Sequence, residues 1–336
     1  MKKIWFPVLV CLISFSSLIN NASAWDYPLI VDLIHIKFDY ESGYAYDALD
    51  IRKNQSGRKI QADFTHNQDD VYTLGIVAFT TYGEGFGYPQ ETPVDFPNGG
   101  PASPYTTFTT YGSVPNSVGK RSFKWKWYIT KVNGVPFPWG DYLWFTDTGW
   151  HTHYTLLAAP QNPMSVPWTD VLDYACVWAS GKSSESQAVS EITEKAYTSL
   201  GKNYYGEATH AQGTTFNLTG FLSSSWADCR DMSATVHVFT RAIGGTATAV
   251  WWIDGGMYTK AIKIIGGSSW QIKWFAFHQV AYRSGVYDAC LKLRQAVGVN
   301  ERVPKGENMD NPYKRDLFDH GDWEPDDGSF SYDSVN

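Results

Sequence analysis

The chain has 336 residues and a formal net charge of −7, and 16% of its residues are aromatic, including 15 Trp and 21 Tyr. This length is enough for two domains with well-buried cores. Nucleic-acid binding requires clustered basic residues, and the sequence has none, so composition argues against a nucleic-acid partner. Much of the negative charge lies in residues 301–336, which contain ten acidic and four basic residues.

Residues 1–24 have the pattern of a secretory signal peptide. Lys2 and Lys3 precede an apolar run, which ends in the small-residue sequence Ala22-Ser23-Ala24. The apolar run is too short and too interrupted by Ser for a membrane span, and no later stretch is long enough. We therefore expect a secreted or periplasmic protein without a membrane span, beginning near Trp25 after cleavage.

The first half of the mature chain, residues 25–160, is expected to form an antiparallel β-sandwich. Polar and apolar residues alternate over 28–82, with turn residues between the runs, as is typical of half-buried strands. Residues 83–119 are rich in Gly, Pro, Ser and Thr, which favours a long surface loop with at most one strand. Strands are expected again over 122–158, where Asn133-Gly134 is a strong hairpin-turn signal.

The second half, residues 161–300, is expected to be an α+β domain in which helices precede an antiparallel sheet. Apolar spacing predicts helices from Thr169 or Asp170 to Gly181, from Ser183 or Ser184 to Gly201, and from near Cys229 to Gly244-Gly245. Strands are predicted within residues 247–254, 259–266, 270–282 and 285–293. The acidic segment that follows, residues 301–336, is poor in aliphatic residues and is expected to be a partly disordered tail.

Three cysteines lie beyond the predicted signal peptide, and Cys229 is the candidate nucleophile among them. It begins the third predicted helix, where free N–H groups and the helix dipole favour an anion. The polar neighbours Asp228 and Arg230 also favour this interpretation over that of a buried structural cysteine. An odd number of cysteines leaves at least one unpaired in an oxidising compartment. If Cys229 is the nucleophile, Cys176 and Cys290 are free to form a disulfide, provided that their Cα atoms lie within about 7 Å.

His278 and Asp288 are the candidate base and its orienting group. His278 ends an apolar strand, where an ordinary buried histidine is the alternative interpretation, and Asp288 follows a predicted turn at 283–285. A three-residue loop would make the two side chains diagonal neighbours on one face of the sheet. A two-residue loop would put them on opposite faces. The same register places Cys290 opposite His278 as a rival nucleophile, but Cys290 lacks a helix N-terminus.

Other residues are candidates for an oxyanion donor, for an alternative base or for metal ligands. The backbone N–H of Cys229 could bind an oxyanion, with Trp226 or Gln212 as a second donor. His237 lies more than two helical turns beyond Cys229, too far to act as its base. His151 and His153 share one face of a strand, but no Cys or carboxylate cluster completes a metal site, so we predict no metal.

The segments around these residues resemble the transglutaminase-like superfamily, the secreted bacterial type of papain-like Cys-His-Asp thiol enzymes. The resemblance covers roughly residues 169–300. It rests on Cys229 with Asp231, Ala234 and Arg241-Ala242-Ile243-Gly244, on the small-residue strand Ala247-Thr248-Ala249-Val250, and on His278 and Asp288 at the positions of the base and its orienter. The chain departs from the family at Gly245-Thr246, where Ile-Pro is common, and in its shorter His-to-Asp spacing.

The resemblance implies a papain-like domain in which Cys229 attacks an amide carbonyl of a protein or peptide substrate. His278 would protonate the departing amine, and the acyl-thioester would pass to water or to a second amine. We expect a peptidase or amidase rather than a cross-linking transglutaminase, because water is readily available as the acyl acceptor at the site of an exported protein. No cofactor is implied, because thiol acyl transfer requires none.

A function of another class is also open: a secreted module that binds peptide or glycan and carries a degenerate thiol fold. In either case the β-domain could contact a cell-wall or other extracellular target. Its tryptophans could form a stacking platform or fill a core, and they are Trp125, Trp127, Trp139, Trp144 and Trp150.

Overall fold

The structure is a computed structural model, and its described part is mostly β-strand with largely antiparallel pairing. It describes residues 31–38, 48–52, 59–68, 70–83, 87–112, 114–136, 142–165, 168–207, 210–246, 249–294, 300–325 and 330–336. The predicted signal peptide, residues 1–24, lies outside the described residues. Among those described, no helix is both long and apolar enough to cross a lipid bilayer.

The chain divides into two compact units, which we call the N-terminal and the C-terminal unit. The N-terminal unit comprises Met1–Ala45, Ser56–Ser113 and Ser122–His151, and the C-terminal unit comprises Tyr46–Gln55, Val114–Arg121 and Thr152–Asn336. This division differs from the single boundary expected at residue 160. Strand β2 (Ala48–Arg52) accounts for part of the difference, because it pairs in parallel with β11 (His151–Leu156), which is distant in sequence.

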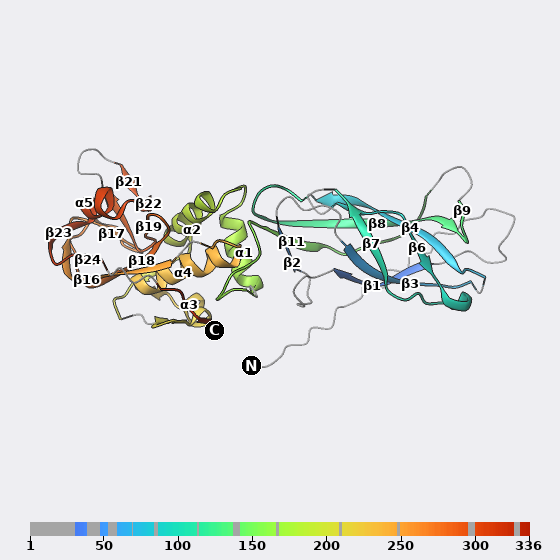
Figure 1. Cartoon of the computed structure of the whole chain (residues 1–336), viewed down its shortest axis with the longest axis horizontal. Coiled ribbons are helices and arrows are strands. Elements are labelled where there is room, and N and C mark those ends of the chain that lie inside the picture. Colours follow the sequence, from blue (N-terminus) through green and yellow to red (C-terminus); the bar gives the residue numbers. More distant parts are fainter. Residues whose placement is uncertain are drawn as a thin grey trace. The chain divides into compact units, whose positions relative to one another are not determined.

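The N-terminal unit contains two sets of antiparallel strands around an aromatic core (Figure 1). The first sheet has the order β1-β3-β7-β5, and in the second set β4 pairs with β6 and β8, while β8 also pairs with β9 and β10. Trp125 and Trp127 are fully buried, and Trp127 packs edge-on against Phe64 and Phe108 of the first sheet. The bounds are β1 Val31–Phe38, β3 Lys59–His66, β4 Thr73–Gly83, β5 Tyr88–Pro89, β6 Thr92–Asp95, β7 Thr106–Tyr111, β8 Gly119–Val132, β9 Val135–Pro136 and β10 Leu143–Asp147.

The stretch expected to be mainly loop, residues 83–119, contains more strand than its composition indicates. β5, β6, β7 and the start of β8 all lie within it, together with a 3-10 turn at Pro97–Gly99. β7 has the sequence TTFTTY, in which Phe108 and Thr110 are buried between exposed residues. Threonine is β-branched and therefore favours the extended backbone of a strand. Because it is also polar, a buried threonine does not show up in the sequence as an apolar position, and the alternation of apolar and polar residues is not recognised. By contrast, the expected turn at Asn133-Gly134 is confirmed, and both residues have positive φ between β8 and β9.

Three helices of the C-terminal unit begin and end close to the predicted positions, and they are α1 Thr169–Trp178, α2 Glu185–Ser199 and α4 Cys229–Ala242. A further helix, α3 (Leu218–Ser223), was not predicted. Ser184 caps α2 by accepting the N–H of Gln187, as its spacing predicts. No side chain caps α1, which begins after Trp168. α3 lies in a stretch expected to be irregular, where Asn217 provides the cap.

The sheet of the C-terminal unit has the order β22-β19-β18-β16-β23, with β24 also pairing to β16. α4 packs against β18 and against α1 and α2 (Figure 1). Cys229, at its start, lines a pocket together with residues 274–277 of β18. Smaller sheets are formed by β17-β20-β21, β12-β15 and β13-β14-β25. The bounds are β12 Asn203–Tyr204, β13 Ala211–Gln212, β14 Thr215–Phe216, β15 Trp226–Ala227, β16 Ala249–Thr259, β17 Lys263–Ile264, β18 Trp274–Tyr282, β19 Val286–Tyr287, β20 Leu291–Arg294, β21 Glu301–Arg302, β22 Lys305–Glu307, β23 Phe318–Gly321, β24 Glu324–Pro325 and β25 Ser334–Val335.

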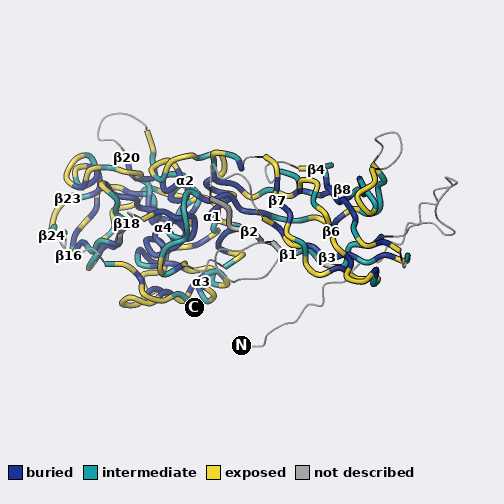
Figure 2. The backbone as a smooth tube through the Cα atoms, turned by 45° about the vertical axis from the view of Figure 1, so that its right-hand side comes forward, coloured by how far each residue is buried: buried dark blue, intermediate teal, exposed yellow. Residues whose placement is uncertain are grey.

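The acidic C-terminal segment, expected to be partly disordered, is packed into the C-terminal unit where it is described. A π-helical turn at Met309–Lys314 leads into α5 (Arg315–Leu317), and both Tyr313 and Leu317 are buried. Near the chain end, Tyr332 is buried and its hydroxyl accepts a hydrogen bond from Gln279. Burial of these few large side chains outweighs the acidic composition on which the expectation rested. Figure 2 shows the buried stretches within this segment.

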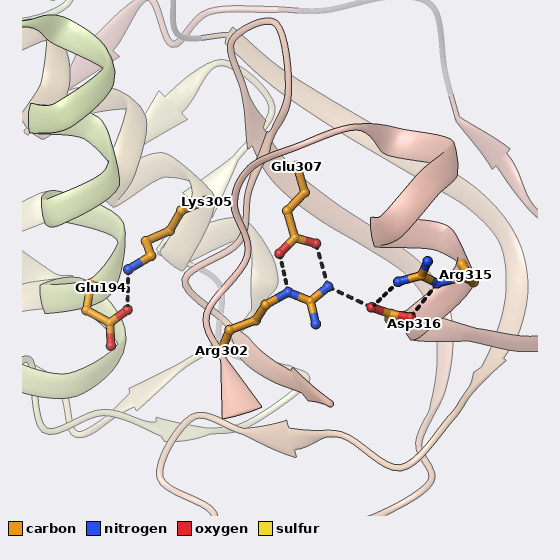
Figure 3. A network of polar contacts seen from close by, with 6 residues as sticks. All are labelled: Glu194, Arg302, Lys305, Glu307, Arg315 and Asp316. Carbon is orange, nitrogen blue, oxygen red and sulfur yellow. Dashed lines mark hydrogen bonds and ion pairs between the residues drawn. The ribbon is translucent and has the colours of Figure 1, made fainter. Parts of the chain in front are cut away.

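A network of ion pairs joins the parts of this segment to one another (Figure 3). Arg302 donates to both carboxylate oxygens of Glu307 and, at 2.8 Å, to Asp316. Asp316 is buried, which opposes its ionisation, but Arg315 and Arg302 outweigh this effect and lower its pKa. Lys305 of β22 reaches Glu194 of α2 at 2.8 Å, in a more exposed pair. Acidic side chains that would repel one another in an extended tail are therefore paired with basic side chains in the folded structure.

Replacing Arg302 by Met should lower the free energy of unfolding by about 2–3 kcal/mol, because it removes charged hydrogen bonds from a buried carboxylate. Lys305→Met is the matched control, and its half-exposed pair should contribute less than about 1 kcal/mol. Urea denaturation measures both. The carboxylate of Asp316 stabilises the fold when ionised, so its contribution is present at neutral pH and lost as the pH falls through its lowered pKa. The difference in the free energy of unfolding between wild type and Arg302→Met should therefore become smaller below about pH 4. Equal effects of the two variants at pH 7 would contradict this assignment.

Candidate active site

Cys229 is the first residue of α4, as the sequence predicts. Asp228 forms the N-cap, and its carboxylate accepts the N–H groups of Arg230 and Asp231. Asp231 in turn accepts the N–H of Asp228, which completes a capping box. The N–H of Cys229 has no hydrogen-bond partner among the described residues. The thiol is therefore held at the positive end of a firmly capped helix.

His278 and Asp288 meet across the turn between β18 and β19. Tyr282 faces Val286, so the loop has three residues, and the prediction that the two side chains share one face is confirmed. His278 Nε2 lies 2.8 Å from Asp288 Oδ2, and both side chains are almost completely buried. The carboxylate accepts from Nε2–H, which leaves Nδ1 as the ring nitrogen available to another group.

Three further contacts hold Asp288 and His278 in place. The hydroxyl of Tyr313 donates to Asp288 Oδ2 at 2.7 Å, and the N–H of Cys290 donates to Oδ1 at 2.9 Å. The ring of Phe275 stacks on His278 with centroids 5.0 Å apart. Sequence reasoning missed Tyr313, because it lies in the segment expected to be a tail and has no motif spacing to Asp288.

The protonation of His278 is governed by opposing effects. Burial disfavours the imidazolium, but the charge and hydrogen bond of Asp288, together with the side chain of Cys229, outweigh burial and raise the pKa of His278 to about 10. Within the described structure Nδ1 makes no hydrogen bond of good geometry. Because Nε2 is engaged by Asp288, Nδ1 is the nitrogen left to interact with the thiol of Cys229. His278 is thus bonded to Asp288, and the side chain of Cys229 is near enough to raise its pKa.

A pocket of about 250 Å³ opens beside Cys229. Its lining residues are Tyr204, Gly206, Asp228, Cys229, Trp274, Phe275, Ala276 and Phe277. Cys229 is only 2% exposed, so it lies at the base of this pocket rather than at an open rim. A small electrophile or one substrate group could reach the thiol there.

Tyr204 is a pocket residue that the sequence reasoning did not select. Burial, together with nearby Cys290 and Cys229, raises the pKa of its hydroxyl well above the usual range, so the group stays protonated and can donate. That hydroxyl has no hydrogen-bond partner within the described residues. β12 pairs with β15 so that Tyr204 lies opposite Ala227, which places it next to the start of α4. Trp226 and Gln212, the expected oxyanion donors, are exposed and do not line the pocket.

Asp228 is the acidic residue of the pocket lining, and Arg230 largely neutralises its charge. Burial and the neighbouring Asp231 raise the pKa of Asp228 to about 6, while Arg230 opposes them. Arg230 donates its Nε–H to Asp228 at 2.7 Å and lies over the ring of Phe277. Asp231 points away from the pocket and accepts the N–H of Ala211 at 2.8 Å.

All three described cysteines are free, so the expected Cys176–Cys290 disulfide is wrong. Cys176 lies on α1 with Asp173 and Arg121 nearby, whereas the charged neighbour of Cys290 is Asp288. The two thiols therefore occupy different surroundings. Burial, followed by Asp288, raises the pKa of Cys290, and this residue does not line the pocket. It is a poorer nucleophile than Cys229 on both counts.

None of the other candidate histidines and tryptophans named from the sequence lines this pocket where the structure describes them. His237 is buried in α4 near Tyr332, while His151 packs against Phe123 and Trp125. No group of three or more His, Cys, Asp or Glu with metal-binding geometry occurs in the described residues. Trp125 and Trp127 belong to the core, and Trp139 lies outside the described residues. Trp150 is exposed beneath Lys124, and Trp144 is half-buried beside Lys126.

Comparisons with known proteins do not identify the chain. No family model matches it, and no curated protein does. One similar solved structure is that of the N-terminal domain of PorA, at 9% identity and a TM-score of 0.17, covering 39% of this chain and 99% of that one. A similarity this weak carries no argument about fold or function.

Asp288→Asn should lower the pKa of His278 from its value of about 10, because burial still disfavours the imidazolium after the negative charge is removed. NMR titration of the His278 ring carbons measures this change. Asp254→Asn, at an exposed carboxylate of β16, is the control and should leave the titration unchanged. A fold check by near-ultraviolet circular dichroism accompanies both variants. An unchanged His278 titration in Asp288→Asn would refute the proposed control by this carboxylate.

Proposed function

We propose that this protein is a secreted cysteine enzyme of the transglutaminase-like type, which cleaves amide bonds of protein or peptide substrates. The observation that carries the proposal is the buried His278–Asp288 hydrogen bond, with Cys229, which raises the pKa of His278, lining an adjacent pocket. A nucleophile, a base and an orienting carboxylate are the groups that thiol acyl transfer requires. Their order along the chain and their placement on a helix and a hairpin agree with the papain-like arrangement.

In the first half-reaction the sulfur of Cys229 attacks the carbonyl carbon of the substrate amide. A C–S bond forms and the carbonyl electrons move to oxygen. Collapse of this tetrahedral species breaks the C–N bond, and His278 gives its proton to the departing amine. Asp288 keeps the imidazole oriented and stabilises its charged form. The product is an acyl-thioester on Cys229 and a free amine.

In the second half-reaction neutral His278 accepts a proton from water, whose oxygen attacks the thioester carbonyl. The C–S bond then breaks, the carboxylic acid leaves, and the thiolate–imidazolium pair is restored. An amine in place of water would give a cross-link. We favour hydrolysis, because the pocket opens to solvent and its lining offers no carboxylate free to hold a second amine.

Two donors are suited to stabilise the oxyanion in both half-reactions. Cys229 and Tyr204 both line the pocket, and the N–H of Cys229 and the hydroxyl of Tyr204 lack partners among the described residues. Preorganised donors of this kind act at the position where negative charge develops. Tyr204 takes the role that we had expected of Trp226 or Gln212.

The N-terminal unit is proposed to be a β-sandwich that contacts a cell-wall or other extracellular target. A row of half-buried and exposed rings on it supports a binding role, with neighbouring centroids 5.4–5.7 Å apart along Tyr111, Tyr88, Phe79 and Tyr142. A purely non-catalytic binding protein is the weaker alternative. It would not require a buried His–Asp pair beside a thiol. The predicted signal peptide supports a secreted or periplasmic location.

Iodoacetamide should alkylate Cys229 selectively at pH 7, because the imidazolium of His278 stabilises the attacking thiolate. His278→Ala should lower the rate by about tenfold or more, within the range expected for loss of a base. Mass spectrometry of the modified peptide measures the rate at each pH, and Cys229→Ala confirms the assignment. The same variants are then tested for hydrolysis of denatured casein. Alkylation of Cys229 that does not depend on His278 would overturn the proposal.

Tyr204→Phe should weaken binding of a peptide aldehyde by about tenfold to a hundredfold, because the hemithioacetal formed with Cys229 loses one oxyanion donor. Alkylation by iodoacetamide creates no oxyanion, so its rate should stay the same in this variant. Tyr205→Phe changes an adjacent exposed hydroxyl and serves as the control. Equal aldehyde affinity in Tyr204→Phe and wild type would remove Tyr204 from the mechanism.

A further inference from the structure

Exposed apolar side chains of the C-terminal unit are concentrated around the Cys229 pocket. The large apolar residues that are exposed in its described part are Tyr174, Val177, Tyr205, Trp226, Tyr258, Ile272 and Trp274. Only Tyr174 and Val177 lie elsewhere, on α1. The other residues are on segments that line the pocket or pair with such segments. A concentration of exposed apolar surface beside a pocket marks a place where a partner or ligand binds.

Three of these side chains form what we call the aromatic rim: Tyr205, Trp226 and Trp274, exposed by 49%, 51% and 56%. Tyr205 lies between the lining residues Tyr204 and Gly206, and its ring is 5.9 Å from that of Trp226. Trp274 itself lines the pocket from β18. The rim therefore comes from three separate stretches: Tyr205 directly follows β12, Trp226 belongs to β15 and Trp274 to β18.

The pocket inside the rim is suited to uncharged groups. Apart from Cys229, its walls are four aromatic residues, Gly206, Ala276 and Asp228. Asp228 is the only charged lining residue, and Arg230 already binds its carboxylate. A charged substrate group would lose its hydration there without gaining an opposite charge. An apolar group would instead gain from contact with the rings.

The size of the pocket limits what can enter. At about 250 Å³ it is smaller than the roughly 300–1,000 Å³ typical of sites that enclose a whole small ligand. It can take the reacting amide with one neighbouring side chain. The rest of a longer substrate would remain outside, where only the rim is available to contact it.

We propose that the aromatic rim and the pocket form a subsite for a large apolar or aromatic side chain on the residue next to the attacked amide of a polypeptide substrate. This inference rests on the proposed function, because it takes Cys229 as the attacking group. Within that function it names the substrate class: peptides with aromatic or bulky aliphatic residues beside the reacting bond, ahead of those with acidic or basic ones.

The test uses three reagents with the same reacting group: iodoacetamide, N-phenethyl-iodoacetamide and N-(2-carboxyethyl)-iodoacetamide. In each case the sulfur of Cys229 bonds to the methylene carbon and iodide leaves, so intact-protein mass spectrometry gives the second-order rate constants. On the full chain, the phenethyl reagent should react at least about tenfold faster than the carboxyethyl reagent, after division by their rates with free glutathione. An apolar ring gains burial that a carboxylate does not.

Trp274→Ala and Trp226→Ala should each reduce the phenethyl preference at least about threefold, where the preference is taken relative to the iodoacetamide rate of the same variant. Val177→Ala, at an exposed apolar residue of α1, is the matched control and should retain the preference. A wild-type protein with no phenethyl preference, or a preference that survives both Trp variants, overturns the subsite. Failure of the proposed function would look different, because the iodoacetamide rate itself would then be independent of His278.

Discussion

The buried carboxylate of Asp288 is the constraint on which the geometry of the candidate site depends. It lies 2.8 Å from His278 and accepts further hydrogen bonds from the Tyr313 hydroxyl and the Cys290 N–H. A buried ion is costly unless such partners are present, so loss of any one would weaken the others. The donors come from β18, from the turn after β19 and from the C-terminal segment. Correct packing of three distant stretches is therefore a condition for orienting the base.

The C-terminal segment contributes to this site instead of trailing from it. It supplies Tyr313 directly, and Tyr332 holds Gln279, the neighbour of His278 on β18. Its ion pairs hold the segment in place, and Arg302 joins Glu307 to Asp316 (Figure 3). The acidic residues that make the segment look unstructured are in part paired with arginines of the same segment. Composition is a poor guide where opposite charges can pair inside a fold.

The position of the thiol depends on a different feature, the N-terminus of helix α4, where Cys229 is the first residue. The capping box of Asp228 and Asp231 satisfies two first-turn N–H groups, and the N–H of Cys229 has no partner among the described residues. Packing of α4 against β18 then places Cys229 beside residues 274–277 at one pocket, while the next residue of β18, His278, is fully buried. The pocket lining is mainly aromatic, and Tyr204 adds a protonated hydroxyl. Under the proposed function, this setting suits neutral amide substrates, for which negative charge appears only during reaction.

Local patterns in the sequence determined the helix that begins at Cys229, the three-residue turn that brings His278 and Asp288 onto one face, and the hairpin at Asn133-Gly134. Each depends on contacts between residues close in sequence, which periodicity and capping can describe. Only the tertiary structure decided that Tyr204 and Tyr313 join the site, that Cys176 and Cys290 stay apart, and that threonine-rich β7 enters a sheet. Those outcomes depend on burial against residues far along the chain. Packing of that kind leaves no regular spacing in the sequence from which it could be predicted.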